Sequence, residues 1–193
     1  MMYFYVLNEV NPLRVISGSA RGRKLSAPEG LDTRPTTERV KESIFNIISP
    51  YLPATNILDL FAGSGAMGIE ALSRAGHHAV FVEQDEKALS VIKKNLQDTR
   101  LYDRAEVIRT DAFSFLQHNA VRFDIIFLDP PYNKGLLTKA MDEIYRLSLL
   151  SDNGIIVAES EYGGELPSGN GFDLIKQAKY GKTVVSVFRT ISD

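Results

Sequence analysis

Strands and helices are expected to alternate from residue 56 onward, and this rhythm limits the folds that the chain can adopt. Short apolar segments typical of strands are separated by stretches in which apolar residues recur at helical spacing. The expected strands are 56–61, 78–83, 105–110, 123–128 and 154–160, and the expected helices between them are 66–75, 86–98, 112–119 and 135–149. Such units build a parallel sheet that is covered by helices on both faces.

The last two apolar segments, 172–181 and 183–190, have no helix-length segment between them. Parallel strands need a long crossover, whereas antiparallel strands can follow each other directly, so we expect these segments to form an antiparallel hairpin at the sheet edge. The predicted fold class is therefore α/β and Rossmann-like, with a seven-stranded, mostly parallel sheet.

Composition supports a single globular main domain. The chain has 193 residues, of which 44% are hydrophobic, and this is enough for a substantial core. No apolar run reaches the roughly 18–20 residues that a membrane span needs, and residues 1–13 lack the features of a signal peptide. The absence of cysteine fits a cytoplasmic location and excludes thiolate zinc sites and cysteine nucleophiles. The three histidines are scattered, so we expect no metal site.

The region before residue 54 differs from the rest of the chain. Residues 14–34 mix short apolar pieces with glycine, serine and basic residues, which predicts a small hairpin or arm, and helical spacing begins at Thr36. Seven basic residues face three acidic ones between 14 and 41. This excess is typical either of a nucleic-acid contact or simply of a solvated loop. We predict an N-terminal extension at 1–53 and the main domain at 54–193.

A glycine-rich turn follows the first expected strand. In DLFAGSGAMG, three glycines fit the G-x-G-x-x-G spacing that brings a ligand close to a backbone turn at a helix N-terminus. Glu83 ends the next strand, 18 residues after Gly65, where a carboxylate can accept hydrogen bonds from ribose hydroxyls. A nucleotide-like ligand is indicated, and these two features leave a nicotinamide oxidoreductase open.

Two further acids separate these alternatives. Asp59 precedes the glycines, where it would repel a pyrophosphate but would suit a cationic amino group. Asp111 follows the third strand and could accept a hydrogen bond from an adenine amine, although an ordinary helix N-cap is the other interpretation. Together the acids favour S-adenosylmethionine, which has an amino-acid end, a ribose and an adenine.

The fourth strand ends in Asp129-Pro130-Pro131-Tyr132, which resembles a motif of the amino-methyltransferases. The lone pair of an exocyclic amine is delocalised into the base, so the amine attacks well only when its hydrogens are held out of plane. The Asp129 carboxylate and the Pro130 carbonyl can accept these two N–H groups, and Tyr132 can stack on a flipped base. The alternative is a rigid acidic turn without a ligand.

With these motifs, the chain resembles the bacterial RsmD-like methyltransferases, which methylate the N2 amine of a guanine in 16S ribosomal RNA. The likeness spans residues 14–190 and rests on RVISGSARGRKL, LDTRPTTERVKESIFNII, DLFAGSGAMGIEALSRAG, VFVEQD and FDIIFLDPPY. The TRPT segment that leads into RVKESIFN is the most particular to this family. The first 13 residues depart from the family pattern, and we assign them no function.

The resemblance implies a role for each site residue. The methionine end of the cofactor would lie against Asp59, Gly63 and Gly65, its ribose against Glu83 and its adenine against Asp111, and the further cofactor-binding residues would be Ala62 and Ala112. The target amine would lie at Asp129, Pro130 and Tyr132. The candidate RNA contacts are Arg21, Arg23, Lys24, Arg34 and Arg39.

The expected partner is 16S rRNA or the assembling small ribosomal subunit, and we expect a monomer. The alternatives are methylation of adenine N6 in DNA or RNA or of a protein glutamine, a nicotinamide oxidoreductase, and an RNA-binding module without activity.

Overall fold

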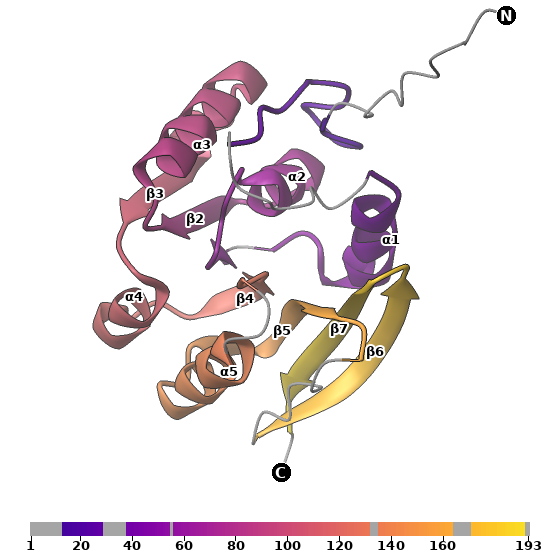
Figure 1. The fold of residues 1–193 in the computed structure, drawn as a ribbon, viewed down its shortest axis with the longest axis vertical. Coiled ribbons are helices and arrows are strands. Elements are labelled where there is room, and N and C mark those ends of the chain that lie inside the picture. Colours follow the sequence, from indigo (N-terminus) through magenta and orange to yellow (C-terminus); the bar gives the residue numbers. More distant parts are fainter. Residues whose placement is uncertain (1–12, 29–37, 55, 132–134, 164–170, 192–193) are drawn as a thin grey trace, which may run out of the picture.

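The computed structural model describes residues 13–28, 38–54, 56–131, 135–163 and 171–191. Its centre is a seven-stranded sheet with the strand order β3-β2-β1-β4-β5-β7-β6 (Figure 1). The strands are β1 (Asn56–Asp59), β2 (His78–Glu83), β3 (Ala105–Arg109), β4 (Phe123–Leu128), β5 (Leu150–Glu161), β6 (Phe172–Tyr180) and β7 (Thr183–Thr190). The α-helices are α1 (Glu38–Ile48), α2 (Ala66–Arg74), α3 (Glu86–Thr99), α4 (Ala112–His118) and α5 (Leu136–Arg146), and the short 3-10 helices are η1 (Ser49–Tyr51) and η2 (Tyr102–Arg104).

The strand pairing confirms the predicted fold class. Strands β1 to β5 run parallel to one another, whereas β7 pairs antiparallel with both β5 and β6. Strand order reverses at β1, since the chain builds β2 and β3 on one side of it and β4 on the other. In open α/β sheets, ligands bind at the carboxyl edge beside such a reversal. The fold therefore directs attention to the ends of β1, β2 and β4.

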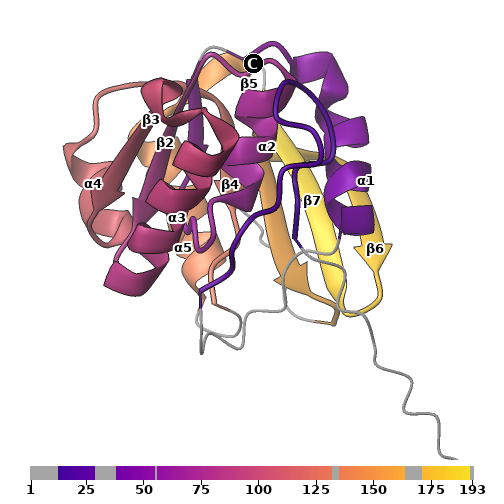
Figure 2. The same ribbon diagram turned by 90° about the horizontal axis from the view of Figure 1, so that it is seen from above.

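Two apolar layers cover the two faces of the sheet. One core cluster joins α1, α2 and α3 to the sheet through buried residues such as Phe45, Leu72 and Leu96. The other joins α4 and α5 to the opposite face and includes Leu116 and Met141. The two views agree that α1, α2 and α3 lie on the side opposite α4 and α5 (Figures 1 and 2).

The predicted arm lies along α2 and α3 (Figure 2). Its two sides meet in an antiparallel bridge between Arg14 and Lys24, so the prediction of a small hairpin is confirmed in its simplest form. Val15 and Leu25 are buried in the same core cluster as α1 and α2. The arm thus packs on the main sheet domain by apolar contact, and the boundary at residues 53 and 54 stays a prediction.

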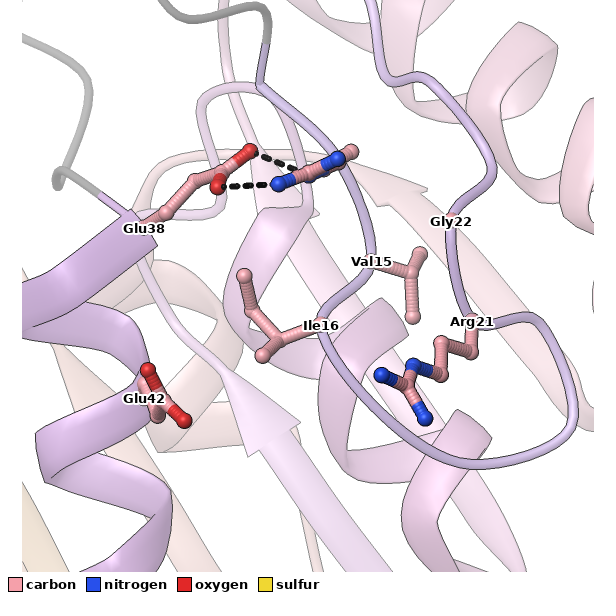
Figure 3. A pocket seen from close by; sticks show the side chains of 7 residues that line it. Val15, Ile16, Arg21, Gly22, Glu38 and Glu42 are labelled. Carbon is pink, nitrogen blue, oxygen red and sulfur yellow. Dashed lines mark hydrogen bonds and ion pairs between the residues drawn. The ribbon is translucent and has the colours of Figure 1, made fainter.

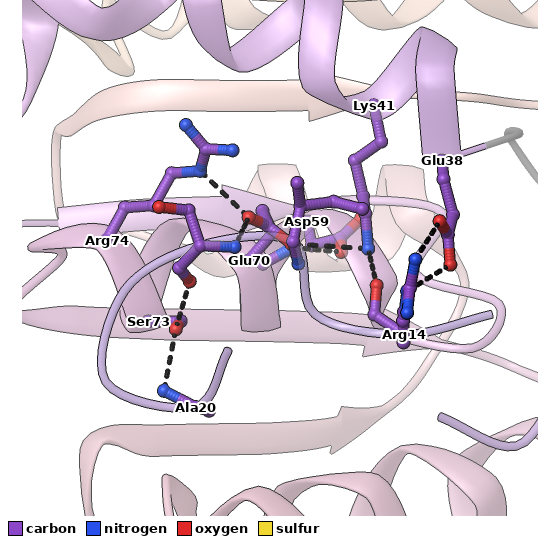
Figure 4. Close-up of polar contacts among 11 residues, drawn as sticks. Arg14, Ala20, Glu38, Lys41, Asp59, Glu70, Ser73 and Arg74 are labelled. Atoms are coloured by element: carbon purple, nitrogen blue, oxygen red, sulfur yellow. Dashed lines mark hydrogen bonds and ion pairs between the residues drawn. The ribbon is translucent and has the colours of Figure 1, made fainter. Parts of the chain in front are cut away.

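A buried polar network fixes the arm on α2 (Figure 4). The Glu70 carboxylate accepts hydrogen bonds from the backbone amides of Ile16 and Ser17, at 2.7 and 3.0 Å, and pairs with Lys41 of α1 at 3.2 Å. Arg74 completes the network at 2.8 Å from Glu70. Burial lowers the pKa of Lys41, and the Glu70 carboxylate opposes that shift. Lys41 was counted with the basic arm, but it is fully buried and so cannot contact a partner.

Several element boundaries differ by one to four residues from the sequence expectations; for example, β1 ends two residues earlier and α5 three residues earlier than expected. Helix α1 is described from Glu38, since residues 36 and 37 lie outside the described residues. Strand β5 begins at Leu150, four residues earlier than expected, because Leu150 pairs with Phe123 ahead of a register shift. No helix in the described part of the chain is long and apolar enough to cross a membrane.

Candidate active site

Three predicted acids lie on three adjacent strands at the carboxyl edge. Asp59 is the last residue of β1 and is level with Phe81 in β2 and Phe127 in β4. Glu83 and Asp129 lie two residues beyond those levels on the flanking strands. Since neighbouring strands are about 4.8 Å apart, the three carboxylates surround one small region of the edge.

Asp59 is the most buried of the three. It is 5% exposed, and its Oδ2 accepts a hydrogen bond of 3.0 Å from the backbone amide of Gly68 in α2. Burial raises the pKa of Asp59 to about 7, the Gly68 amide opposes the shift, and the negative charges of Asp129 and Glu83 add to it. A buried carboxylate with one amide partner and two like-charged neighbours is well suited to bind a cation.

The glycine-rich turn approaches both Asp59 and Glu83. A side chain at Gly68 would place its Cβ 2.4 Å from the Phe81 ring and 3.3 Å from the Asp59 carboxylate, so only glycine permits this packing. The Gly63 amide donates to Glu83 Oε2 at 3.0 Å, and the other oxygen of Glu83 accepts from two amides of its own turn. Two of the predicted glycines therefore each donate a backbone hydrogen bond to one of the predicted acids.

Asp111 continues the acidic edge on β3. Glu83 is level with Arg109 in β3, and Asp111 lies two residues beyond that level. Asp111 is also the N-cap of α4, because its Oδ1 accepts hydrogen bonds from the amides of Phe113 and Ser114. The N-cap interpretation is thus correct. Since both bonds use Oδ1, they leave Oδ2 for another donor. Ala112, beside it, is buried.

Asp129 and Pro130 leave β4 together at the same edge. Pro130 is buried, whereas Asp129 is exposed as a residue. Desolvation by its surroundings nevertheless raises the pKa of Asp129 to about 6. Tyr132, the third predicted catalytic residue, lies outside the described residues. Asp129 is therefore an acceptor that is open to a ligand and close to Asp59.

The edge is strongly acidic and is suited to a cationic ligand with hydroxyl groups. A pyrophosphate would lie against Asp59 and Glu83 and would be repelled by both. An ammonium or sulfonium group would instead relieve the mutual repulsion of the carboxylates. Within the described residues, no three His, Asp or Glu side chains are grouped so that they could hold a metal ion.

The candidate RNA-contacting residues differ in exposure and in their partners. Arg21, Lys24 and Arg39 are exposed, and none of the described ion pairs involves them. Arg23 is half-buried and donates to the Asp98 carbonyl of α3 at 2.6 Å. Arg34 lies outside the described residues.

The tip of the arm points away from the acidic edge. Ala20 donates to the Ser73 hydroxyl at 3.0 Å, and Ser73 lies near the end of α2 that is remote from that edge. At 1.5 Å per residue, α2 places the tip about 12 Å from the glycine-rich turn. Arg21 therefore lies far from the acids, and Lys24 lies nearer to them.

A pocket of about 220 Å³ opens between the arm and α1 (Figure 3). Arg14 is engaged there by Glu38 through two contacts of 2.7 and 3.0 Å. Glu42 also lines this pocket. Because the acids offset the two arginines, the pocket is a poor anion site, and it is separate from the acidic edge.

Sequence reasoning missed Asn95 of α3, which connects the arm to the glycine-rich turn. Asn95 is fully buried. Its Oδ1 accepts from the Ser26 amide at 2.8 Å, and its Nδ2 donates to the carbonyls of Ser26 and Ser64, both at 2.9 Å. The only available signal was an amide on the apolar side of a helix between Ile92 and Leu96, which is weak without the fold.

The strand order and the acidic edge together define the Rossmann-like fold of the class I methyltransferases. More particularly, the chain belongs to the family described as Conserved hypothetical protein 95, whose model matches residues 13–189. This match and the relatives described next confirm the resemblance to the RsmD-like family.

The relatives are similar over most of their length. The chain is 47% identical over 182 residues to "Putative rRNA methyltransferase YlbH" of Bacillus subtilis, which covers 92% of this chain and 98% of the relative. It is 39% identical to "Ribosomal RNA small subunit methyltransferase D" of Escherichia coli, with 81% of this chain and 78% of that protein covered. Among solved structures, "Putative methyltransferase yhhF" from Escherichia coli superimposes with a TM-score of 0.82 at 37% identity and covers 92% of this chain and 97% of its own.

Proposed function

We propose that the protein transfers a methyl group from S-adenosylmethionine to the N2 amine of a guanine in 16S rRNA. The single observation that carries this proposal is the position of Asp129 and Pro130 at the end of β4, beside the buried Asp59 carboxylate. Family membership and the names of the relatives support rRNA of the small subunit as the substrate. We further propose that the enzyme is a monomer and acts in the cytoplasm.

The residues at the edge fit the cofactor. Asp59 would bind the ammonium group, and the turn at Ala62, Gly63 and Gly65 would pass close to the methionine end. Glu83 would accept hydrogen bonds from the ribose hydroxyls, and the exposed Asp111 would accept from the adenine amine beside Ala112. When bound, S-adenosylmethionine supplies a methyl group on a positively charged sulfur.

The residues at the end of β4 prepare the acceptor. The Asp129 carboxylate and the Pro130 carbonyl would accept the two N–H groups of the guanine amine and turn its lone pair out of the plane of the base. Tyr132 would stack on the flipped base. The amine needs no strong base before it attacks, because it becomes acidic only after it gains the methyl group.

Exposed basic residues would bind the phosphates of the RNA. Lys24 and Arg39 are exposed and without a described ion-pair partner, so they are the strongest candidates. Arg21 at the tip would contact a more distant part of the RNA, and Arg23 supports the arm through Asp98. Such contacts fix register without reading sequence.

The test is methyl transfer from labelled S-adenosylmethionine to small ribosomal subunits that lack the modification, with double-stranded DNA as the comparison substrate. We expect label in 16S rRNA and none in DNA. Thermal melting in parallel should show stabilisation by S-adenosylmethionine and none by NAD. Label in DNA, or stabilisation by NAD alone, would overturn the proposal.

A further inference from the structure

The turn between β6 and β7 (residues 180–183) lies at the same edge of the sheet as the acids. Thr183 pairs with Glu161 at the end of β5, and β5 lies next to β4. A hydrogen bond of 2.8 Å from the Tyr162 amide, just after β5, to the Lys182 carbonyl joins the end of β5 to this turn. Figure 2 shows this turn at the end of the yellow strands, on the opposite side of the sheet from β3.

The register fixes how far the turn lies from the proposed acceptor. Leu128 is level with Ala158, so Asp129 is level with Glu159, and Tyr162 lies three residues beyond. At about 3.3 Å per residue along the strand and 4.8 Å between strands, Tyr162 lies roughly 11 Å from Asp129. This distance is suited to nucleotides that flank a base held at Asp129.

The chemistry of this turn differs from that of the acidic edge. Tyr162 is 59% exposed, and the Lys179 ammonium lies 3.0 Å from the centre of its ring. Lys182 is exposed, and neither lysine takes part in a described ion pair. Among the described residues at this turn, Glu161 is the neighbouring acid, and the two lysines outnumber it. An exposed aromatic ring beside unpaired cations is the combination that binds single-stranded RNA.

We propose that Tyr162, Lys179 and Lys182, named here the C-terminal contact, bind the RNA strand next to the target guanine. The inference rests on the proposed function, since it takes RNA as the substrate. The lysines bind phosphates, and the Tyr162 ring stacks on a base. The exposed Lys24 and Arg39 would bind other phosphates of the same RNA.

The decisive experiment compares two double substitutions in the same hairpin. K179A/K182A removes both cations of the C-terminal contact. K176A/R189A removes the same charge from exposed positions further from the turn, because Arg189 lies opposite Asp173 near the other end of the hairpin. Binding of a 16S rRNA fragment to the full chain is measured by filter retention at several salt concentrations, and S-adenosylmethionine affinity is measured separately.

We expect K179A/K182A to bind RNA roughly tenfold more weakly near 0.1 M salt. The slope of log affinity against log salt concentration should be smaller in magnitude by about 1.4, as for two lost phosphate contacts. Its S-adenosylmethionine affinity and melting temperature should stay at wild-type values. K176A/R189A should keep at least most of the RNA affinity. Equal losses in the two variants, or wild-type binding by K179A/K182A, would overturn the proposal.

Tyr162 is tested separately. Y162F keeps the ring and should bind RNA as the wild type does, whereas Y162A should lose about fivefold or more in affinity. Equal binding by both variants would exclude stacking. Because RNA binding is measured without methyl transfer, a wild-type protein that binds RNA by this surface but transfers no methyl group would refute the proposed function alone.

Discussion

At the scale of single residues, the electrostatics of Asp59 explain why this edge favours a cation. Its carboxyl is buried between Asp129 and Glu83, and its pKa is raised to about 7. The free protein thus keeps a costly arrangement of like charges, which a positively charged ligand would relieve. Natural proteins often retain such unfavourable arrangements at functional sites.

The first prediction concerns Asp59 and cofactor binding. The ammonium of the cofactor binds the ionised carboxylate, so affinity should rise with pH and level off above about 7. For a single group of this pKa, S-adenosylmethionine should bind about tenfold more tightly at pH 8 than at pH 6. Titration calorimetry over this range measures the effect, and D59N should bind weakly with little pH dependence. A flat profile in the wild type would contradict this role.

The second prediction is that replacing Asp59 by asparagine stabilises the folded protein. Because the pKa of about 7 in the folded protein lies above the ordinary value of 3.8, the native state holds the proton more tightly, and stability falls as pH rises between these values. D59N removes that loss and can still accept from the Gly68 amide. We expect D59N to melt at a higher temperature than the wild type at pH 8 and to show a smaller difference at pH 5. A lower melting temperature at pH 8 would show that the ionised carboxylate is stabilising.

Asp129 gives the residue-scale test of catalysis. D129A removes one acceptor from the target amine and should lower methyl transfer by about a hundredfold or more, the usual effect of losing one preorganised polar contact. S-adenosylmethionine affinity should remain within a fewfold of the wild type. Single-turnover transfer to small subunits measures the rate, and near-normal transfer by D129A would rule out this role.

At the scale of elements, buried polar side chains hold the arm in place. Glu70 accepts hydrogen bonds from two arm amides and forms ion pairs with Lys41 and Arg74. Asn95 connects the arm to the glycine-rich turn. The arm backbone also packs directly against α2 at Gly18, since a Cβ there would lie 1.8 Å from the Ser73 carbonyl. The arm is therefore part of the folded domain surface and not a loose tail.

Glu70 provides the element-scale prediction. E70A leaves a buried lysine and two arm amides without their acceptor, and the free energy of unfolding should fall by about 3–5 kcal/mol. Urea unfolding measures the loss. E143A, which breaks the exposed pair with Arg146, is the control and should leave the unfolding midpoint near the wild-type value. Similar midpoints for E70A and the wild type would show that the network does not stabilise the arm.

At the scale of the whole molecule, much of the fold could be predicted from the sequence because local patterns agree with it. The apolar segment FDIIFL predicted a buried strand, and the spacing of Gly63, Gly65 and Gly68 predicted a turn that leads into a helix. Both predictions are confirmed. The alternation of strands and helices predicted the parallel part of the sheet and the terminal antiparallel hairpin, both confirmed by the strand pairing, whereas the strand order was not predicted. Here the local and global preferences agree.

The parts that the sequence did not reveal depend on long-range contacts. Lys41 and Glu70 are 29 positions apart, and nothing near either residue indicates that they share a buried site. Asn95 likewise gains its importance from Ser26 and Ser64, which belong to other segments. Charge counts placed Lys41 with the surface cations because counting residues cannot distinguish a buried cation from an exposed one.

The most direct test of the account is to identify the methylated nucleoside. Small ribosomal subunits that lack the modification are incubated with the protein and S-adenosylmethionine, and the 16S rRNA is digested and analysed by mass spectrometry. We predict N2-methylguanosine at one position with the wild type and a strong reduction with D129A. Methyl groups on adenine N6, or on a ribosomal protein with none in the rRNA, would contradict it.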